Sequence, residues 1–104
     1  MEEKVLRKLF LGFIHIHILH HARQEPIYGL WMIKELHQHG YSISAGTLYP
    51  ILSGLAKDEL LSVEVKVIKG KVRKYYSITA KGKHVLAEAS QKCAELFQEI
   101  NVEL

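Results

Sequence analysis

The cations of this 104-residue chain are concentrated in one segment. Between Lys66 and His84 there are seven Lys and Arg residues and no acidic residue, whereas residues 85–104 contain one Lys and four Glu. A local excess of positive charge attracts polyanions such as nucleic acid. The segment therefore predicts nucleic-acid binding, and the alternative is a solvated edge strand that lysines protect from aggregation.

The seven histidines offer a second kind of chemistry. His17 and His21 have the spacing at which two imidazoles on one helix can bind a metal ion. No HExxH motif or pair of carboxylates accompanies them, and His15 falls on the opposite side of a helix from His17. Imidazoles satisfied by hydrogen bonds are the favoured interpretation, so we expect no metal and no cofactor. His37 and His39 are interpreted as a helix end, where imidazolium suits the helix dipole.

Composition excludes several classes of protein. With 48% apolar and 24% charged residues, the chain is typical of one globular domain. The single cysteine, Cys93, excludes an internal disulfide framework and fits a reducing cytoplasm. We find no Gly-rich phosphate loop, nucleophile elbow or acid pair, so we expect no enzyme. The apolar stretch from Leu9 to Leu19 is too short to span a bilayer, which needs about 20 residues, so we expect no membrane partner.

The elements that must position these residues begin with three predicted helices. Residues 3–23 carry apolar side chains on nearly every side, so this helix must be covered all round. A second helix runs from residue 27 or 28 to His39 and is stopped by Gly40. A third runs from Ala45 to about Lys57. Ser44 is its expected N-cap, because the hydroxyl can accept a hydrogen bond from an amide of the first turn.

After residue 61 the apolar pattern becomes alternating. It predicts a strand around residues 63–67, a turn at residues 69–71 and a second strand at residues 72–78, which form a β-hairpin. From Thr79 the chain is helical again, with apolar residues at the 3, 4, 3, 4 spacing of a coiled-coil seam. A seam predicts a partner helix and therefore a homodimer. The seam residues are Leu86, Ala89, Cys93, Leu96 and Ile100.

The order of these elements predicts a mainly α fold with a small β-hairpin. It is a winged helix-turn-helix with an N-terminal helix and a long C-terminal dimerisation helix. Residues 1–80 would form the DNA-binding domain and residues 81–104 the dimerisation helix, in one compact unit. The third helix would enter the major groove, with the hairpin as the wing beside it.

Four motifs, in this order, resemble the PadR family of transcriptional regulators. They are Ile27-Tyr28-Gly29, SAGTLYP at residues 44–50, LAKD at residues 55–58 and RKYYSITAKG at residues 73–82. The resemblance covers about Leu9 to Ile100. It implies a dimeric, ligand-responsive repressor of the small subfamily with a single C-terminal helix. A two-fold dimer further predicts binding to an inverted repeat in double-stranded DNA.

The resemblance also assigns DNA contacts by position. Tyr28 would hold a phosphate at the start of the second helix. A glycine lets the backbone approach DNA, short hydroxyls can donate to phosphate or base edges, and helix N-termini favour anions. For Thr47 and Tyr49 the alternatives are first-turn capping and core packing. The expected contacts from the third helix are Ser44, Gly46, Thr47 and Tyr49, and those from the wing are Lys71, Arg73 and Lys74.

Some residues depart from the family pattern. Glu59 stands where a glycine is usual, so we expect no left-handed residue in that turn, and Gly54 stands where a basic residue is usual. Trp31 lies on a polar face, and a cover by a helix of the dimer partner is favoured over ligand stacking. The resemblance implies small aromatic effectors, for which Phe97 and Trp31 are candidates. The alternative function is a metal- or haem-responsive regulator that uses the histidine-rich first helix.

Overall fold

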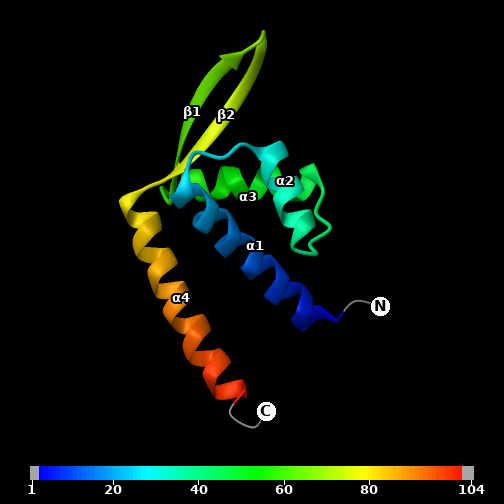
Figure 1. Ribbon diagram of the computed structural model, residues 1–104, viewed down its shortest axis with the longest axis vertical. Helices are drawn as coiled ribbons and strands as arrows, with labels where there is room; N and C mark the ends of the chain where they lie inside the picture. The colour runs from blue at the N-terminus through cyan, green and yellow to red at the C-terminus, as the bar shows by residue number, and fades with distance from the viewer. Residues whose placement is uncertain (1–2, 102–104) are drawn as a thin grey trace.

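The computed structural model describes residues 3–101. Three helices form a compact group, a long hairpin projects from it, and a fourth helix starts at the base of the hairpin and runs away from it past α1 (Figure 1). This architecture confirms the predicted mainly α winged helix-turn-helix. In chain order the elements are α1 (Lys4–Gln24), α2 (Gly29–Gln38), α3 (Ala45–Lys57), β1 (Leu61–Ile68), β2 (Lys71–Ile78) and α4 (Ala80–Ile100).

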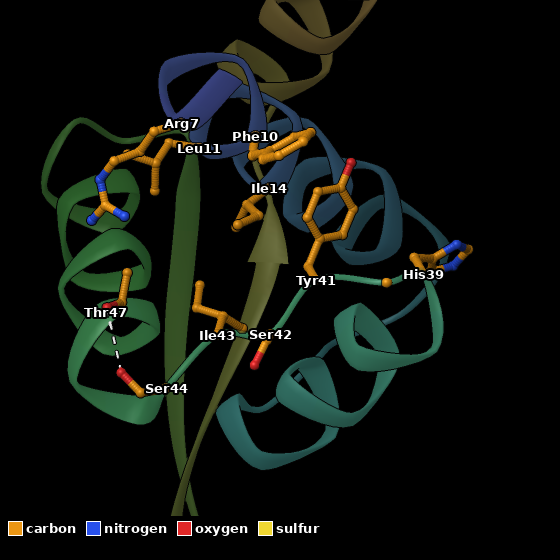
Figure 2. Close-up of a pocket in the computed structure, with 11 residues that line it drawn as sticks. Arg7, Phe10, Leu11, Ile14, His39, Tyr41, Ser42, Ile43, Ser44 and Thr47 are labelled. Atoms are coloured by element: carbon orange, nitrogen blue, oxygen red, sulfur yellow. Dashed lines mark hydrogen bonds between the residues drawn. The ribbon is translucent and has the colours of Figure 1, made fainter. Parts of the chain in front are cut away.

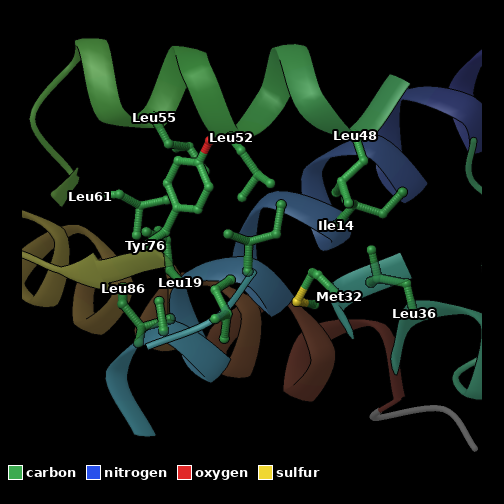
Figure 3. Packing of buried hydrophobic residues seen from close by; sticks show 13 residues of the cluster. Ile14, Leu19, Met32, Leu36, Leu48, Leu52, Leu55, Leu61, Tyr76 and Leu86 are labelled. Atoms are coloured by element: carbon green, nitrogen blue, oxygen red, sulfur yellow. The ribbon is translucent and has the colours of Figure 1, made fainter. Parts of the chain in front are cut away.

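The hydrophobic core lies where the first three helices meet the base of the hairpin. Leu48, Leu52 and Leu55 point from α3 into this core (Figure 3). Every buried side chain in residues 3–101 is apolar or is Tyr76, so burial of hydrocarbon holds the elements together. The side chains that are less than 2% exposed are Ile18, Ile27, Met32, Leu36, Leu48, Leu52 and Leu61.

Only the second half of α1 is covered within the protomer. Its buried residues are Ile14, Ile18, Leu19 and Ala22. The first half exposes large apolar side chains, among them Val5 at 69% and Leu6 at 46%. One protomer therefore buries one side of the second half of this helix, and the predicted cover on all sides is not provided within the protomer.

Gly40 ends α2, as the sequence predicts. Its φ is +88°, a left-handed conformation that glycine adopts without strain. The amide of Gly40 donates to the carbonyl of His37 at 3.0 Å, and the amide of Tyr41 donates to that of Leu36 at 2.9 Å. This pair of hydrogen bonds is a Schellman motif, which satisfies the last carbonyls of the helix.

The end of α3 has the same geometry without a glycine. The amide of Glu59 donates to Ala56 at 3.0 Å and that of Leu60 donates to Leu55 at 2.9 Å. Glu59 has φ +64°, so the expectation that this turn needs no left-handed residue was wrong. The Schellman hydrogen bonds impose that conformation on whichever residue stands there, at a cost of about 1 kcal/mol for a non-glycine residue.

The hairpin turns through two residues in the left-handed region. Lys69 has φ +51° and Gly70 has φ +78°. Two such residues form the type I′ turn that matches the twist of paired strands. Both strands are longer than the sequence predicts, because pairing continues from Ile68 with Lys71 at the tip to Leu61 with Ile78 at the base.

A tight joint connects the start of α4 to the turn after α3. Thr79 caps α4: its hydroxyl oxygen accepts from the amide of Gly82 at 2.9 Å and its hydroxyl donates to the carbonyl of Glu59 at 2.6 Å. A Cβ at Gly82 would collide with the backbone carbonyl of Leu60. Glycine at this position therefore allows α4 to lie directly on the chain that enters the wing.

Candidate nucleic-acid interface

The solvent-facing side of α3 carries small residues. Its opposite side is buried, while Gly46, Thr47 and Ser53 are exposed. A Cβ at Gly46 would meet only the Ser44 hydroxyl, at an ordinary contact distance of 3.7 Å. The fold therefore does not require glycine at residue 46, and its absence of a side chain leaves the backbone open to a close external partner.

Ser44 begins α3, but it does not make the predicted hydrogen bond. Its backbone is extended, as in an N-cap, yet no side-chain cap hydrogen bond forms. The hydroxyl instead donates to the hydroxyl of Thr47 at 3.4 Å (Figure 2). Ser44 is therefore the N-cap residue, as predicted, but the predicted hydrogen bond was wrong, because the Ser44 side chain turns toward the side chain of Thr47 one turn ahead. As a result, the Ser44 side chain does not occupy the first-turn amides of α3, where anions can bind, although the amide of Thr47 donates to the carbonyl of Ser44 at 3.1 Å.

The motif at the start of α2 is tied to the wing and to α3. The amide of Ile27 donates to the carbonyl of Tyr76 at 2.9 Å, and the amide of Tyr76 donates back at 2.7 Å. A Cβ at Gly29 would collide with the ring of Tyr49, so that ring packs directly on the start of α2. Tyr49 is still 45% exposed. Packing is thus one role of Tyr49, and its exposed part stays a predicted DNA contact.

Tyr28 lies beside the wing cations. The guanidinium of Arg73 lies 4.3 Å from the centre of the Tyr28 ring. Tyr75 meets Tyr28 edge-on at 5.5 Å, and the ammonium of Lys66 lies 5.3 Å from the Tyr75 ring. Hydrogen bonding to Tyr75 raises the pKa of Arg73, which is therefore a permanent cation. Residues from the first and last motifs thus form one cationic and aromatic cluster, which includes two residues that the sequence analysis missed, Lys66 and Tyr75.

The wing cations divide between its two faces. Arg73 pairs across the hairpin with Lys66, and Lys74 pairs with Val65. Because side chains alternate along a strand, Lys71 shares a face with Arg73 while Lys74 points to the opposite face. The three predicted wing contacts therefore do not form one group. Lys71 and Arg73 lie on the face that carries Tyr75, and Lys74 lies among exposed valines.

A groove of about 710 Å³ separates α1 from the turn before α3. Figure 2 shows Arg7 of α1 and Thr47 of α3 facing this groove, which Tyr41 also lines. Arg7 adds a cation near the start of α3. The sequence analysis missed it because Arg7 comes from an element about forty residues away along the chain.

The predicted seam is divided between the core and the surface. Leu86 is buried in the protomer's own core and Ala89 is half-buried, so Leu86 is not available to a partner. Farther along α4, Leu96 is 52% exposed and Ile100 is 63% exposed. A groove of about 490 Å³ separates α1 from α4. It is lined by Phe13, Ile16, His17, His20, Tyr41, Leu86, Ser90 and Cys93.

Trp31 and Phe97 are not brought together. The indole of Trp31 meets the His21 ring of α1 edge-on at 5.4 Å and is half-buried in its own chain. Cover of its exposed part by a partner helix stays a prediction. Phe97 is 68% exposed on α4, which lies on the other side of α1 from α2 (Figure 1).

Three histidines meet beside α1. One ring nitrogen from each of His17, His21 and His39 lies within 4.8 Å of the other two. One Glu35 oxygen lies 3.1 Å from Nε2 of His39 and 3.5 Å from Nε2 of His21. Burial lowers the pKa of both His17 and His21, neighbouring imidazoles lower it further, and Glu35 opposes this. His39 does stand at the end of α2, but the sequence analysis missed that it joins the pair on α1.

Comparison with known proteins gives consistent results. The chain matches the Transcriptional regulator PadR-like family over residues 18–88. It is 39% identical over 95 residues to the transcriptional regulator Rv3488 of Mycobacterium tuberculosis, covering 91% of this chain and 89% of that protein. A PadR-like transcription factor from Bacteroides fragilis is 32% identical with a TM-score of 0.82, covering 98% of this chain and 100% of that one. A PadR-like transcriptional regulator from Bacillus cereus is 32% identical with a TM-score of 0.81, covering 90% of this chain and 93% of that one.

Within residues 3–101, no helix is long and apolar enough to cross a membrane.

Proposed function

This chain belongs to the PadR-like family of transcriptional regulators, and from that premise we propose that it is a dimeric repressor that binds an inverted repeat in double-stranded DNA. It is a transcriptional regulator and not an enzyme. One observation carries the proposal: residues from three separate motifs meet on one surface, where Tyr28 contacts Arg73 and Gly29 contacts Tyr49. That surface adjoins the open first turn of α3.

The types of residue on this surface suit DNA. Phosphate contacts position a protein on the duplex, and contacts with base edges give sequence specificity. Lys71, Arg73 and Tyr28 would contact phosphates beside the groove. The hydroxyls of Ser44 and Thr47 would reach base edges or phosphate from the first turn of α3, where the helix dipole also favours negative charge.

The uncovered apolar surface supports the dimer. Large apolar side chains are exposed on the first half of α1 and on the last turns of α4, with Val5 at 69% and Ile100 at 63%. Large apolar side chains left exposed on two helices favour an interaction site there. We propose that α4 of one protomer packs on α1 of the other across a two-fold axis. The two α3 helices would then enter major grooves about 34 Å apart.

The groove between α1 and α4 suits the proposed effector. At about 490 Å³ it has the size of a small-molecule site, and Phe13 and Ile16 give it apolar walls. Phe97 is exposed on the same helix as the groove residues Ser90 and Cys93. We propose that a small aromatic compound binds there and alters the packing of α4 on α1. Trp31 is not part of this proposal, because it contacts His21 and does not line this groove.

Selection of binding sites from random DNA tests the function. The protein should select sites with two-fold symmetry whose half-sites lie about one helical turn apart. Thr47→Ala should change the preferred sequence. Gly46→Ala should stabilise the fold slightly, because alanine favours helix by up to about 1 kcal/mol, and yet weaken DNA binding. Selected sites without symmetry, or equal binding to all duplexes, would refute the proposal.

A further inference from the structure

The histidines beside α1 form a cluster that DNA binding does not explain. We propose that His17, His21 and His39 bind one divalent transition-metal ion, with Glu35 as a fourth ligand or as the group that orients the imidazoles. Two of these histidines lie one turn apart on α1. The third comes from the C-terminal end of α2, which the Schellman turn at Gly40 places against α1. His39 also lines the groove that Ser44 and Thr47 line, but none of the four candidate ligands is a proposed DNA contact, so the proposal does not depend on the proposed function.

The distances suit a site that closes around an ion. Zinc binds imidazole nitrogen at about 2.0–2.1 Å, so the nitrogens of a tetrahedral site lie about 3.4 Å apart. The three candidate nitrogens already lie within 4.8 Å of one another. The His39 side chain is 46% exposed and can rotate, while His21 is held between Trp31 and Glu35. Small rotations of the imidazoles therefore complete the geometry.

The hydrogen bonds in the cluster leave ligand capacity unused. Glu35 lies within reach of His39 and His21 but not of His17. In the part of the chain that the structure describes, the His17 ring makes contacts with other rings and no hydrogen bond. A carboxylate next to ligating imidazoles is the usual arrangement around a protein-bound metal. Three neighbouring imidazoles, two of them beside one carboxylate, thus resemble a ligand set more closely than a completed hydrogen-bond network.

The donor atoms select the class of metal. Imidazole nitrogens suit zinc, copper, nickel, cobalt and iron, whereas magnesium and calcium prefer oxygen. Trp31 provides a built-in reporter, because it is the only tryptophan and lies 5.4 Å from the His21 ring. A paramagnetic ion at this site should quench its fluorescence.

Cobalt titration of the full chain, freed of metal and without a histidine tag, tests the site. We expect saturation at one Co²⁺ per protomer, quenching of Trp31, a raised melting temperature, and displacement by Zn²⁺ but not by Mg²⁺. His39→Gln should weaken binding by roughly 100-fold or more, and Glu35→Gln by about 10- to 100-fold.

His37→Gln is the matched control, because it removes an exposed histidine from the same end of α2 without touching the cluster. It should bind Co²⁺ like the native protein. Melting curves recorded in the presence of a chelator establish that the variants fold. Absence of saturable binding, equal losses in the His37 and His39 variants, or binding that leaves Trp31 fluorescence unchanged would each overturn the proposal.

Discussion

The two ends of this molecule differ in how fully one protomer packs their side chains. Around the wing base, backbone hydrogen bonds join Ile27 to Tyr76, and Gly29 and Tyr49 pack without space between them. At the other end, the last turns of α4 expose Phe97 at 68% and Ile100 at 63%. One protomer is sufficient to build the surface proposed to bind DNA. If a second copy covers the helical end, as we propose, folding and assembly depend on different residues.

Gly82→Ala should disrupt the packing at the wing base and have the largest effect on stability. The new methyl group would collide with the backbone carbonyl of Leu60, which cannot move without opening the joint between α4 and the wing. Overpacking of this kind should lower the free energy of unfolding by about 3 kcal/mol. Chemical denaturation measures it.

Gly54→Ala is the control for that variant, because a Cβ there meets open space. It should leave stability unchanged or raise it by up to about 1 kcal/mol. Equal losses in the two variants would show that helix glycines as such, and not the joint, set the stability.

Leu96→Glu combined with Ile100→Glu should prevent association through the last turns of α4. Both side chains are exposed in the protomer, so the charges should leave its fold intact while they prevent apolar association. Sedimentation should show a monomer, and affinity for a symmetric site should fall by roughly 100-fold as the second half-site is lost. Gln91→Glu with Gln98→Glu adds the same charge off the seam. A variant that stays dimeric would place the interface elsewhere.

Lys71→Ala should show which face of the wing contacts phosphate. Each phosphate contact contributes about 0.9 to the slope of log affinity against log salt concentration, so this variant should flatten the slope by about that amount. Lys74→Ala, on the opposite face, should change it less. Binding titrations at several salt concentrations give both slopes, and a larger change for Lys74 would reverse the assignment of the DNA-facing side.

Glu59→Gly should have the smallest effect. Glycine relieves the left-handed strain at φ +64° and should raise the free energy of unfolding by about 1 kcal/mol, with DNA affinity unchanged. Asp58→Gly is the control, because Asp58 has φ −82° and no strain to relieve. Thermal melts of both proteins measure the difference, and a gain in the Asp58 variant would contradict the explanation.

The sequence predicts the elements well because their signals are local. Periodicity and Gly40 place the helices, and alternation places the hairpin. The division of the wing cations depends on strand register, which a one-residue shift reverses. The meeting of His39 with His17 and the burial of Leu86 depend on how the helices pack in space. Those contacts could not be predicted from spacing along the chain. The same holds for the side-chain cap hydrogen bond that Ser44 does not form.

The joint at Gly82 gives α4 the mechanics of a lever. With 21 residues the helix is about 31 Å long. It would pivot at the contact of Gly82 with Leu60, which leaves no space for a Cβ. A tilt of about 10° there moves the far end by about 5 Å. Because this joint is tightly packed, we expect a displacement imposed on the far end of α4 to rotate the turn after α3. We therefore expect the length of α4 to determine how far a given displacement of its C-terminal end rotates α3.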